Sequence, residues 1–550
     1  MGKRITITCP LCNDAVEKLL YRFHIEGERN VIERIKEEHP AWAEDDGICG
    51  RCIDYYHTEI VMQQRLLPEI GPYFPVRSAD DFVVLPTGLR LDADARYAGK
   101  GVTICFIDSG FCAHPDLTAH SNRIKKLFNI NYPERGMEYF LQTRPANWHG
   151  TMTSVVCAGD GFLSNGLYKG IASSAELVLI GVQDEQGRIS REGIVKALRW
   201  VLEHHREYAI RILNMSLGDD EALSYHDSEI DRLAEELIAE GISIVAAVGN
   251  DEQGAIKPPA NAPGVIAVGG ADDNNRVGWD WSAYHSTYGR TADGLMKPEL
   301  VAHAAWMAAP LLPETQEEKE AVTLYELVNT NDSALPDKLA ALIQHIKIQY
   351  DPSGGMPVAR IREVIINRIR EAKYISPHYL HTDGTSFAAP VVSAVIAQLL
   401  EINALLNPAM VREILFATAK RRVDIPAERQ GFGMIQARKA VLRVLKRAHF
   451  TAPPVSPHIN NEARSIAFYM HHDSATQVSL AGSFNGWTPD TLLLQPGRNG
   501  LWKIEIPLLP PGRYQYKFFV DDAMWIEDVN NLYREPDGFM GFNSILIIEN

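Results

Sequence analysis

Residues 381–390 read HTDGTSFAAP, and an apolar run follows them directly. Residues 391–400 carry mostly apolar side chains, which predicts a buried helix that begins near Ser386. Pro390 fits the first turn of such a helix, because a missing N–H costs little there. Free backbone N–H groups at a helix start bind anions, so Ser386 is well placed to stabilise a developing oxyanion. The alternative is that Ser386 only caps a core helix.

Two further segments bring an acid and a histidine to the ends of predicted elements. Residues 102–110, VTICFIDSG, predict a buried parallel strand with Asp108 at its carboxyl end. Residues 147–159, NWHGTMTSVVCAG, place His149 ahead of small and apolar residues, which again predicts a helix start. Each has a plainer interpretation: Asp108 could form a turn, and His149 could cap a helix or be a paired surface histidine.

The chain order Asp108, His149, Ser386 is the order of the catalytic residues in subtilisin. Together with HPDL at residues 114–117, the three segments resemble the signature motifs of the subtilisin-like serine proteases, the subtilase family. The resemblance covers about residues 81–449 and implies a subtilisin-like α/β domain with serine endopeptidase activity.

The resemblance also implies a role for each residue. Ser386 would attack the peptide carbonyl, His149 would act as general base and then general acid, and Asp108 would orient the imidazole. The strand at residues 242–250 ends in Gly-Asn, like the family's oxyanion-hole strand. Asn250 would therefore donate to the oxyanion, and the alternative is a turn asparagine that follows a strand.

The tripeptide Ser216, Leu217 and Gly218 resembles the family's substrate-binding strand, whose backbone pairs with an extended peptide substrate. Asp219 and Asp220 follow it directly, and Asp251 and Glu252 follow Asn250. Carboxylates near the first specificity pocket would favour Lys or Arg in the substrate. The alternative is that these are solvated loop carboxylates.

Strands and helices alternate through this region. Residues 175–182 and 210–215 predict strands, and residues 190–208 and 228–240 predict amphipathic helices. This alternation predicts a doubly wound parallel α/β sheet with the site at the carboxyl ends of the strands.

A segment of about residues 310–379 separates KPELVA at residues 297–302 from Ser386, whereas the corresponding connection in typical subtilases is short. It contains three helical patches. An insertion just before the nucleophile could form a lid, an exosite or an activation switch, or it could be a passive helical pair.

Composition limits the possible partners and the compartment. A chain of 550 residues predicts about three domains, and a net charge of -16 argues against a nucleic-acid partner. The first ten residues lack the apolar run of a signal peptide, and we expect no membrane span. Together these features favour the cytoplasm, where the seven cysteines would be thiols or metal ligands.

Residues 1–80 contain two Cys-x-x-Cys pairs, Cys9 with Cys12 and Cys49 with Cys52. Four thiolates at such spacing predict a structural zinc site, and the alternatives are a redox pair or unused buried thiols. The segment occupies the position of a subtilase inhibitory prodomain, so autoinhibition and partner binding are both open. Calcium stabilises many subtilases, but no loop in this sequence has a clear calcium-binding motif.

The end of the chain changes character. Prolines indicate a linker at about residues 450–462, and short strands separated by turns then predict an immunoglobulin-like β-sandwich at residues 463–550. GSFNGW at residues 482–487 and YQYKFFVD at residues 514–521 resemble the glycogen-binding module of the AMP-activated protein kinase beta subunit and the N-terminal module of isoamylases.

This second resemblance implies a carbohydrate site. Trp487 and Trp525 would stack on sugar rings, and Lys517 and Asn543 would hydrogen-bond to the glucan. The alternative is that the module binds no sugar and only docks on a protein.

Two other functions remain open beside an active intracellular serine endopeptidase that cleaves proteins or peptides. One is a catalytically silent scaffold that binds glucan or protein. The other is a latent protease that needs cleavage or a partner before it is active.

Overall fold

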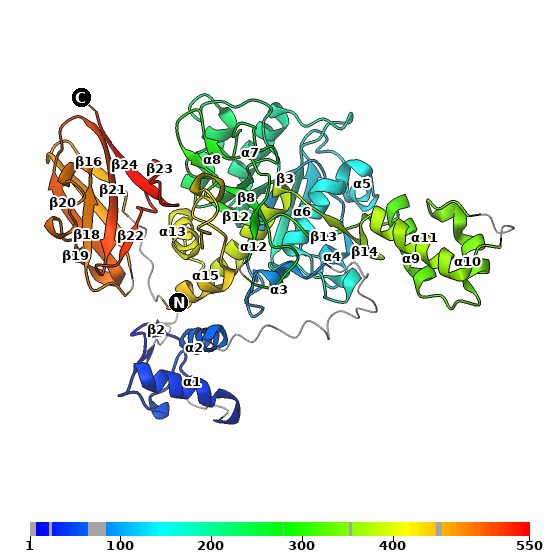
Figure 1. The fold of residues 1–550 in the computed structure, drawn as a ribbon, viewed down its shortest axis with the longest axis horizontal. Coiled ribbons are helices and arrows are strands. Elements are labelled where there is room, and N and C mark those ends of the chain that lie inside the picture. Colours follow the sequence, from blue (N-terminus) through cyan, green and yellow to red (C-terminus); the bar gives the residue numbers. More distant parts are fainter. Residues whose placement is uncertain are drawn as a thin grey trace.

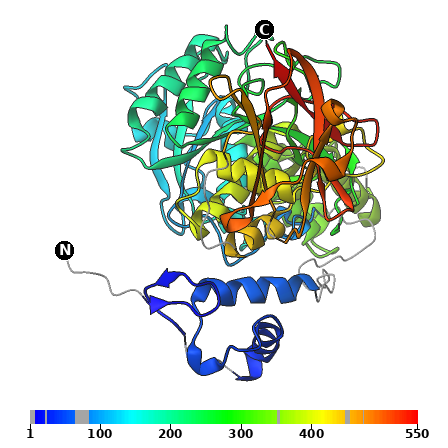
Figure 2. The same cartoon turned by 90° about the vertical axis from the view of Figure 1, so that its left-hand side faces the viewer.

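The computed structural model describes residues 7–20, 25–63, 84–278, 280–350, 355–446, 454–472 and 474–549. Figure 1 shows a central α/β body with a helical insertion on one side and an all-β domain on the other. A small N-terminal domain lies beneath the central body in both views (Figures 1 and 2). We call residues 84–446 the central domain and residues 454–549 the C-terminal domain. The expected boundary near residue 80 and the start of the expected linker at residue 450 lie outside the described residues.

An eight-stranded sheet forms the core of the central domain. Its order is β12-β8-β7-β6-β3-β5-β4; these neighbours are parallel, and β9 joins β8 antiparallel. The strands are β3 (Thr103–Asp108), β4 (Ile124–Asn129), β5 (Glu176–Gly181), β6 (Ile210–Met215), β7 (Ser243–Ala247), β8 (Ile266–Asp272), β9 (Ser282–Ala283) and β12 (Leu300–His303). All six residues of β3 are buried, as expected for a central strand that is covered on both faces.

Helices connect and cover these strands. Helix α12 contacts β6, β7, β8 and β12, and α6 packs against both α12 and β3. The helices of this part are α3 (Thr87–Arg90), α4 (Pro115–Thr118), α5 (Met137–Leu141), α6 (Trp148–Ala158), α7 (Arg191–His204), α8 (Glu229–Ala239), α12 (Thr385–Ile402), α13 (Pro408–Thr418), α14 (Ala427–Gln430) and α15 (Ala437–Lys446). Two short strands, β10 (Gly289–Arg290) and β11 (Met296–Lys297), pair antiparallel.

Helix α12 confirms the expected buried helix and corrects the expected place of Pro390 within it. It is long and apolar enough to span a membrane by composition alone, but 83% of its apolar window is buried inside the protein, so it serves as a core helix. It begins at Thr385, which makes Pro390 its sixth residue. Pro390 therefore lies in the second turn and not in the first, and the carbonyl it leaves without a helical partner is taken by Ser216, as described below.

The insertion forms a subdomain with its own core. Strands β13 (Met307–Pro310), β15 (Tyr379–Thr382) and β14 (Tyr374–Ser376) form an antiparallel sheet at its base. Helices α9 (Gln316–Val328), α10 (Leu335–Leu342) and α11 (Val358–Glu371) pack around buried Leu324, Leu339 and Ile365. The Tyr379 hydroxyl donates to buried Asp116, which ties the base of the insertion to α4.

The N-terminal domain consists of a two-stranded sheet and two helices around one small core. Its elements are β1 (Ile7–Thr8), β2 (Ala15–Val16), α1 (Ile25–Glu38) and α2 (Gly50–Gln63). Helix α2 packs against α15 of the central domain. Tyr97 also donates to Asp54 at 2.7 Å. Figure 2 shows this domain, in dark blue, below the central body.

The C-terminal domain has two antiparallel sheets that share one core. The first has the order β16-β17-β20-β19, and the second has the order β18-β21-β24-β23 with β22 beside β21. The strands are β16 (His458–Asn460), β17 (Ser465–His471), β18 (Val478–Gly482), β19 (Gln495–Pro496), β20 (Leu501–Pro507), β21 (Gly512–Val520), β22 (Met524–Ile526), β23 (Arg534–Pro536) and β24 (Phe542–Ile548).

Buried ion pairs join this domain to the central domain. Glu413 on α13 accepts hydrogen bonds from Arg443 at 3.1 Å and from His471 at 2.9 Å. Arg421 pairs with Glu527, and both side chains are mostly buried. The C-terminal domain is therefore docked against α13 rather than held by its linker alone.

Candidate active site

Asp108 and His149, two residues of the predicted site, are in direct polar contact. Asp108 is the last residue of β3, and its Oδ1 lies 2.7 Å from Nδ1 of His149 near the start of α6. The Ser109 backbone N–H donates to the same oxygen at 2.6 Å. The Asp108 side chain is 1% exposed and that of His149 is 34% exposed, so the carboxylate is buried behind an accessible imidazole.

A glycine permits this approach. A Cβ atom at Gly150 would lie 2.4 Å from the carbonyl oxygen of Gly110, so a side chain there would push α6 away from the loop after β3. The His-Gly pair of the sequence therefore brings the imidazole within hydrogen-bonding distance of Asp108.

The charge of Asp108 also sets the basicity of the histidine. The Asp108 carboxylate raises the pKa of His149 above its usual range, although burial opposes the change. An imidazole with a raised pKa is a stronger proton acceptor, and Asp108 would stabilise the imidazolium that forms.

Ser386 is the second residue of α12 and lies at the free N–H groups of the helix start. Gly384 caps this helix with a φ of +146°, a conformation that a residue with a side chain rarely adopts. The Ser386 hydroxyl donates to the Ser216 carbonyl at 3.4 Å. The Phe387 ring lies 6.5 Å from the His149 ring, centroid to centroid, so the starts of α12 and α6 are adjacent.

Asn250 lies beside this helix start. Its Oδ1 accepts hydrogen bonds from the Thr385 backbone N–H at 2.8 Å and from the Thr385 hydroxyl at 3.0 Å. These two bonds fix which end of the side-chain amide faces the helix. The amide N–H₂ group is then turned away from Thr385 and available as a donor.

The predicted substrate-binding tripeptide follows β6. Ser216 is buried, Leu217 packs against the core, and a Cβ at Gly218 would lie 2.9 Å from the Pro258 carbonyl. The neighbouring carboxylate is not free to bind a substrate cation. Asp219 accepts two hydrogen bonds from Arg191, at 2.6 and 3.2 Å, so the expectation that Asp219 favours basic substrates loses its support.

Sequence reasoning missed a polar chain beneath the serine. The Ser393 hydroxyl donates to Asn214 at 2.9 Å, Asn214 donates to Ser216 at 3.1 Å, and Ser216 donates to the Ser386 carbonyl at 2.9 Å. It also missed Thr153, four residues after His149 on α6, whose hydroxyl lies 3.2 Å from Asp108 Oδ2. The four-residue spacing was the available signal, because it puts both side chains on one helix face.

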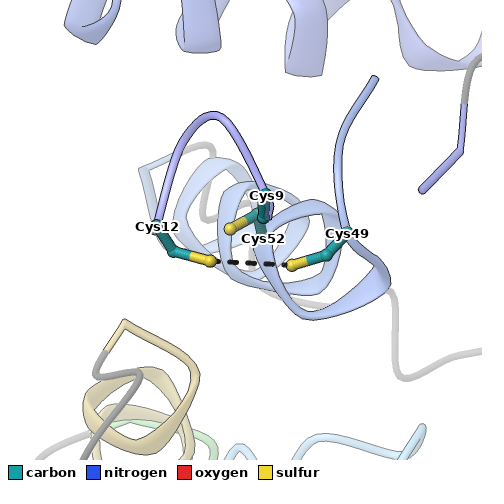
Figure 3. A group of neighbouring side chains, drawn as sticks. All are labelled: Cys9, Cys12, Cys49 and Cys52. Carbon is teal, nitrogen blue, oxygen red and sulfur yellow. Dashed lines mark hydrogen bonds between the residues drawn. The ribbon is translucent and has the colours of Figure 1, made fainter. Parts of the chain in front are cut away.

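The four predicted metal-binding cysteines come together in the N-terminal domain. The sulfur atoms of Cys9, Cys12, Cys49 and Cys52 all lie within 4.8 Å of one another, and Figure 3 shows them converging from one loop and the start of α2. The sulfur atoms of Cys12 and Cys49 are 3.9 Å apart. Four convergent sulfur atoms are a donor set for a soft or borderline metal ion.

The four predicted carbohydrate residues line one pocket of about 750 Å³, together with Arg421 of the central domain. Trp487 and Trp525 meet edge to face, with ring centroids 6.0 Å apart. Lys517 forms an ion pair with Asp537, so its ammonium group is partly neutralised rather than free for a sugar.

Comparisons with known proteins agree with this architecture. Residues 99–433, more than half of the chain, match the subtilase family, and residues 466–549 match the glycogen recognition site of AMP-activated protein kinase. The chain is 26% identical over 355 residues to the serine protease AprX of Bacillus subtilis, covering 62% of this chain and 66% of that protein. It is 30% identical over 184 residues to subtilisin-like protease 1 of Trichophyton verrucosum, covering 32% and 41%. The chain thus spans less than two thirds of the length of these relatives.

Among solved structures, fervidolysin from Fervidobacterium pennivorans, described as a keratinolytic enzyme related to subtilisin, aligns with a TM-score of 0.44. The sequence identity is 16%, and the alignment covers 77% of this chain and 53% of that chain. The family match rests on the sequence of the central domain, which contains the Asp108, His149 and Ser386 motifs. The chain belongs to the subtilase family, whose members are serine endopeptidases.

Proposed function

We propose that this protein is a serine endopeptidase that cleaves peptide bonds through an acyl-enzyme on Ser386. The observation that carries the proposal is the 2.7 Å contact between Asp108 and His149, next to the helix start that holds the serine. The Ser386 hydroxyl first turns from the Ser216 carbonyl to Nε2 of His149. The oxygen then forms a bond to the substrate carbonyl carbon, and its proton passes to Nε2.

The tetrahedral intermediate then collapses. The bond between carbon and the leaving nitrogen breaks, and His149 returns the proton to the amine. Water attacks the acyl-enzyme by the same route and frees Ser386. The oxyanion accepts hydrogen bonds from the Asn250 amide and the Ser386 backbone N–H. Ser216, Leu217 and Gly218 pair with the extended substrate backbone.

Labelling with a fluorophosphonate probe tests the proposal. We expect the full-length protein to be labelled, Ser386→Ala to be unlabelled, and the control Ser109→Ala, a buried serine near Asp108, to be labelled. Mass spectrometry of the adduct would identify the modified residue. A full-length protein that is not labelled under any condition would favour the scaffold function and contradict the proposal.

A latent form of the same protease is the second candidate. The hydrogen bond from the Ser386 hydroxyl to the Ser216 carbonyl favours it, because the hydroxyl must leave this carbonyl before it can reach His149. The position of the N-terminal domain argues against its being a prodomain that covers the active site. The domain contacts the central domain at Tyr97, and the Tyr97 carbonyl accepts a hydrogen bond from Gln398 of α12. Gln398 lies 12 positions after Ser386, which is about 18 Å along the helix. Labelling that appears only after limited proteolysis would identify latency.

We propose that the four cysteines bind a structural zinc ion. A tetrahedral zinc site with bonds of about 2.3 Å needs sulfur atoms about 3.8 Å apart, and Cys12 and Cys49 are 3.9 Å apart. Zinc would stabilise a domain whose core is small. Elemental analysis should find about one zinc per chain, lost in Cys49→Ser and kept in the control Cys112→Ser. A disulfide in place of metal would indicate a redox pair instead.

We propose that the C-terminal domain is an immunoglobulin-like β-sandwich that binds α-glucan in the pocket of Trp487 and Trp525. Two partly exposed indole rings in one pocket support stacking on sugar rings. Binding of maltoheptaose measured by calorimetry should be lost in Trp487→Ala and in Trp525→Ala. The control Ile547→Ala removes an exposed apolar side chain outside this pocket and should bind normally. No binding by the unmodified protein would favour a docking role.

We further propose the domain division 1–80, 81–449, 450–462 and 463–550, supported by separate hydrophobic clusters in the N-terminal, central and C-terminal parts. We propose a cytoplasmic location, supported by seven cysteines that form no disulfide in the described part of the chain. Cell fractionation with detection of the tagged protein tests the location, and recovery from the medium would contradict it.

A further inference from the structure

Arg90 is a fully buried arginine that lies before the family's first motif. It ends the short helix α3, and its side chain is 0% exposed. Its guanidinium donates to both oxygens of Asp273, at 2.8 and 2.7 Å. It also donates to two backbone carbonyls, Ala305 at 2.9 Å and Trp306. Burying this charge is costly unless it is paired, so these bonds fix the guanidinium in one place.

Asp273 holds the other side of the arginine. His303 Nε2 lies 3.1 Å from its Oδ2, and His303 is buried at the end of β12. Burial raises the pKa of Asp273, but the contacts with His303 and Arg90 outweigh it and hold that pKa below its usual range. Asp273 is therefore a charged partner that anchors Arg90 to the central sheet.

The two carbonyls that Arg90 binds belong to the loop that supports the nucleophile. The neighbouring Ala304 carbonyl accepts the Gly384 backbone N–H at 2.7 Å. The Trp306 backbone N–H donates to the Asp383 carboxylate at 2.9 Å. Gly384 is the cap of α12, two residues before Ser386. A shift of this loop would move the helix start and, with it, the Ser386 N–H group.

We propose that Arg90 is a positioning residue that holds the Ala304–Trp306 loop and thereby the oxyanion-binding start of α12. The inference rests on the proposed serine protease function, because the held geometry matters for the oxyanion. Oxyanion donors act in the transition state, so their displacement lowers kcat more than it changes KM. The segment from residue 84 to residue 91 is then part of the catalytic domain, and any activating cleavage would have to occur before it.

The test compares Arg90→Met with Arg412→Met in the full-length protein. Arg412 serves as the control, since it is a partly buried arginine that also donates to two backbone carbonyls, those of Gly264 and Val265. These carbonyls precede β8, at the edge of the sheet opposite the strands' carboxyl ends. We expect Arg90→Met to lower kcat about 10- to 100-fold with KM within about threefold of the unmodified protein, and Arg412→Met to change neither.

Hydrogen exchange gives a second readout that does not need activity. Amides of residues 382–388 should exchange at least about tenfold faster in Arg90→Met than in Arg412→Met, and Arg90→Lys should restore part of the protection. Unchanged exchange in this segment, or a rise in KM with unchanged kcat, would overturn the inference. An unmodified protein without hydrolytic activity would overturn the proposed function. Faster exchange in Arg90→Met would then still show that Arg90 holds the Ala304–Trp306 loop, but not that this matters for catalysis.

Discussion

The Ser216 hydroxyl donates a 2.9 Å hydrogen bond to the backbone carbonyl of Ser386, the residue expected to be the nucleophile. In a regular helix this carbonyl would accept the N–H of residue 390, but that residue is Pro390 and has no N–H. The Ser216 hydroxyl, on the residue after β6, thus supplies the hydrogen bond that the helix lacks. The bond links the end of β6 to the first turn of α12.

This relationship predicts an energetic coupling between Ser216 and Pro390. Ser216→Ala leaves the Ser386 carbonyl without its partner and should destabilise the protein by about 1–3 kcal/mol. In the Pro390→Ala background the new N–H can bind the same carbonyl, so the Ser216→Ala cost should fall by about 1 kcal/mol. Denaturation midpoints of the four proteins of this cycle would measure the coupling. Additive effects would contradict it.

A second prediction concerns the pH dependence of catalysis. His149 acts as a base only when it is neutral, so kcat/KM should rise with pH through its pKa. Asp108 raises this pKa, and Asp108→Asn should therefore move the midpoint to lower pH while it lowers kcat by about 10⁴-fold.

The control is Asp160→Asn. Asp160 pairs with His120 at 2.9 Å, far along the chain from Ser386, and its loss should leave the profile unchanged. A pH–rate profile measured with a chromogenic peptide checks both variants. An unshifted midpoint in Asp108→Asn would argue that another group controls the profile.

A third prediction separates two roles of Asn250. The side-chain oxygen accepts from Thr385, and only the N–H₂ group can donate to an oxyanion. Asn250→Ala should lower kcat about 100- to 1000-fold with little change in KM. Asn250→Asp keeps the acceptor for Thr385 and should be equally impaired. Full activity of the Asp variant would show that the donor is not needed.

A fourth prediction concerns stability. Asp231 on α8 is fully buried beside the polar side chains of Ser228 and Asn261, which offset the cost of its burial only in part. Burial raises its pKa to about 7. The folded state then binds a proton that the unfolded state has released, so this group's contribution to stability falls as pH rises from about 4 to about 7.

Asp231→Asn should remove that dependence and raise the thermal midpoint at pH 8 more than at pH 5. The matched variant Asp219→Asn removes a carboxylate that Arg191 pairs, and it should lower the midpoint at pH 8. Thermal scans at both pH values check the two variants. Equal shifts at pH 5 and pH 8 for Asp231→Asn would contradict the assignment.

Local sequence patterns were sufficient to predict the helix and strand ends where the candidate catalytic residues lie. Asp108, His149 and Ser386 each lie at or near the end of a strongly patterned element, and a parallel sheet is expected to bring such positions to one edge. Ser190 and Ser228 likewise cap α7 and α8, accepting from the backbone N–H groups of Gly193 and Asp231.

Long-range pairing could not be predicted in the same way. Nothing near Arg90 indicates that it binds carbonyls more than two hundred positions later, and Tyr379 meets Asp116 across a similar separation. The pairing of Asp219 with Arg191 also depends on tertiary packing, which is why the sequence could not show that Asp219 is unavailable to a substrate cation. Pro390 was misplaced because it lies four residues after Ser386, so a helix that begins at Thr385 or at Ser386 carries it in the second turn.

The base of the insertion has one last consequence. Pro310 and Tyr379 are paired neighbours on antiparallel strands β13 and β15, so the chain leaves the central domain and returns to it at one point. A tight turn between these strands would bypass the helical subdomain without moving the ends of the break. Relatives could therefore have gained or lost such a cassette in a single step, and a minimal protease could be engineered by excising it.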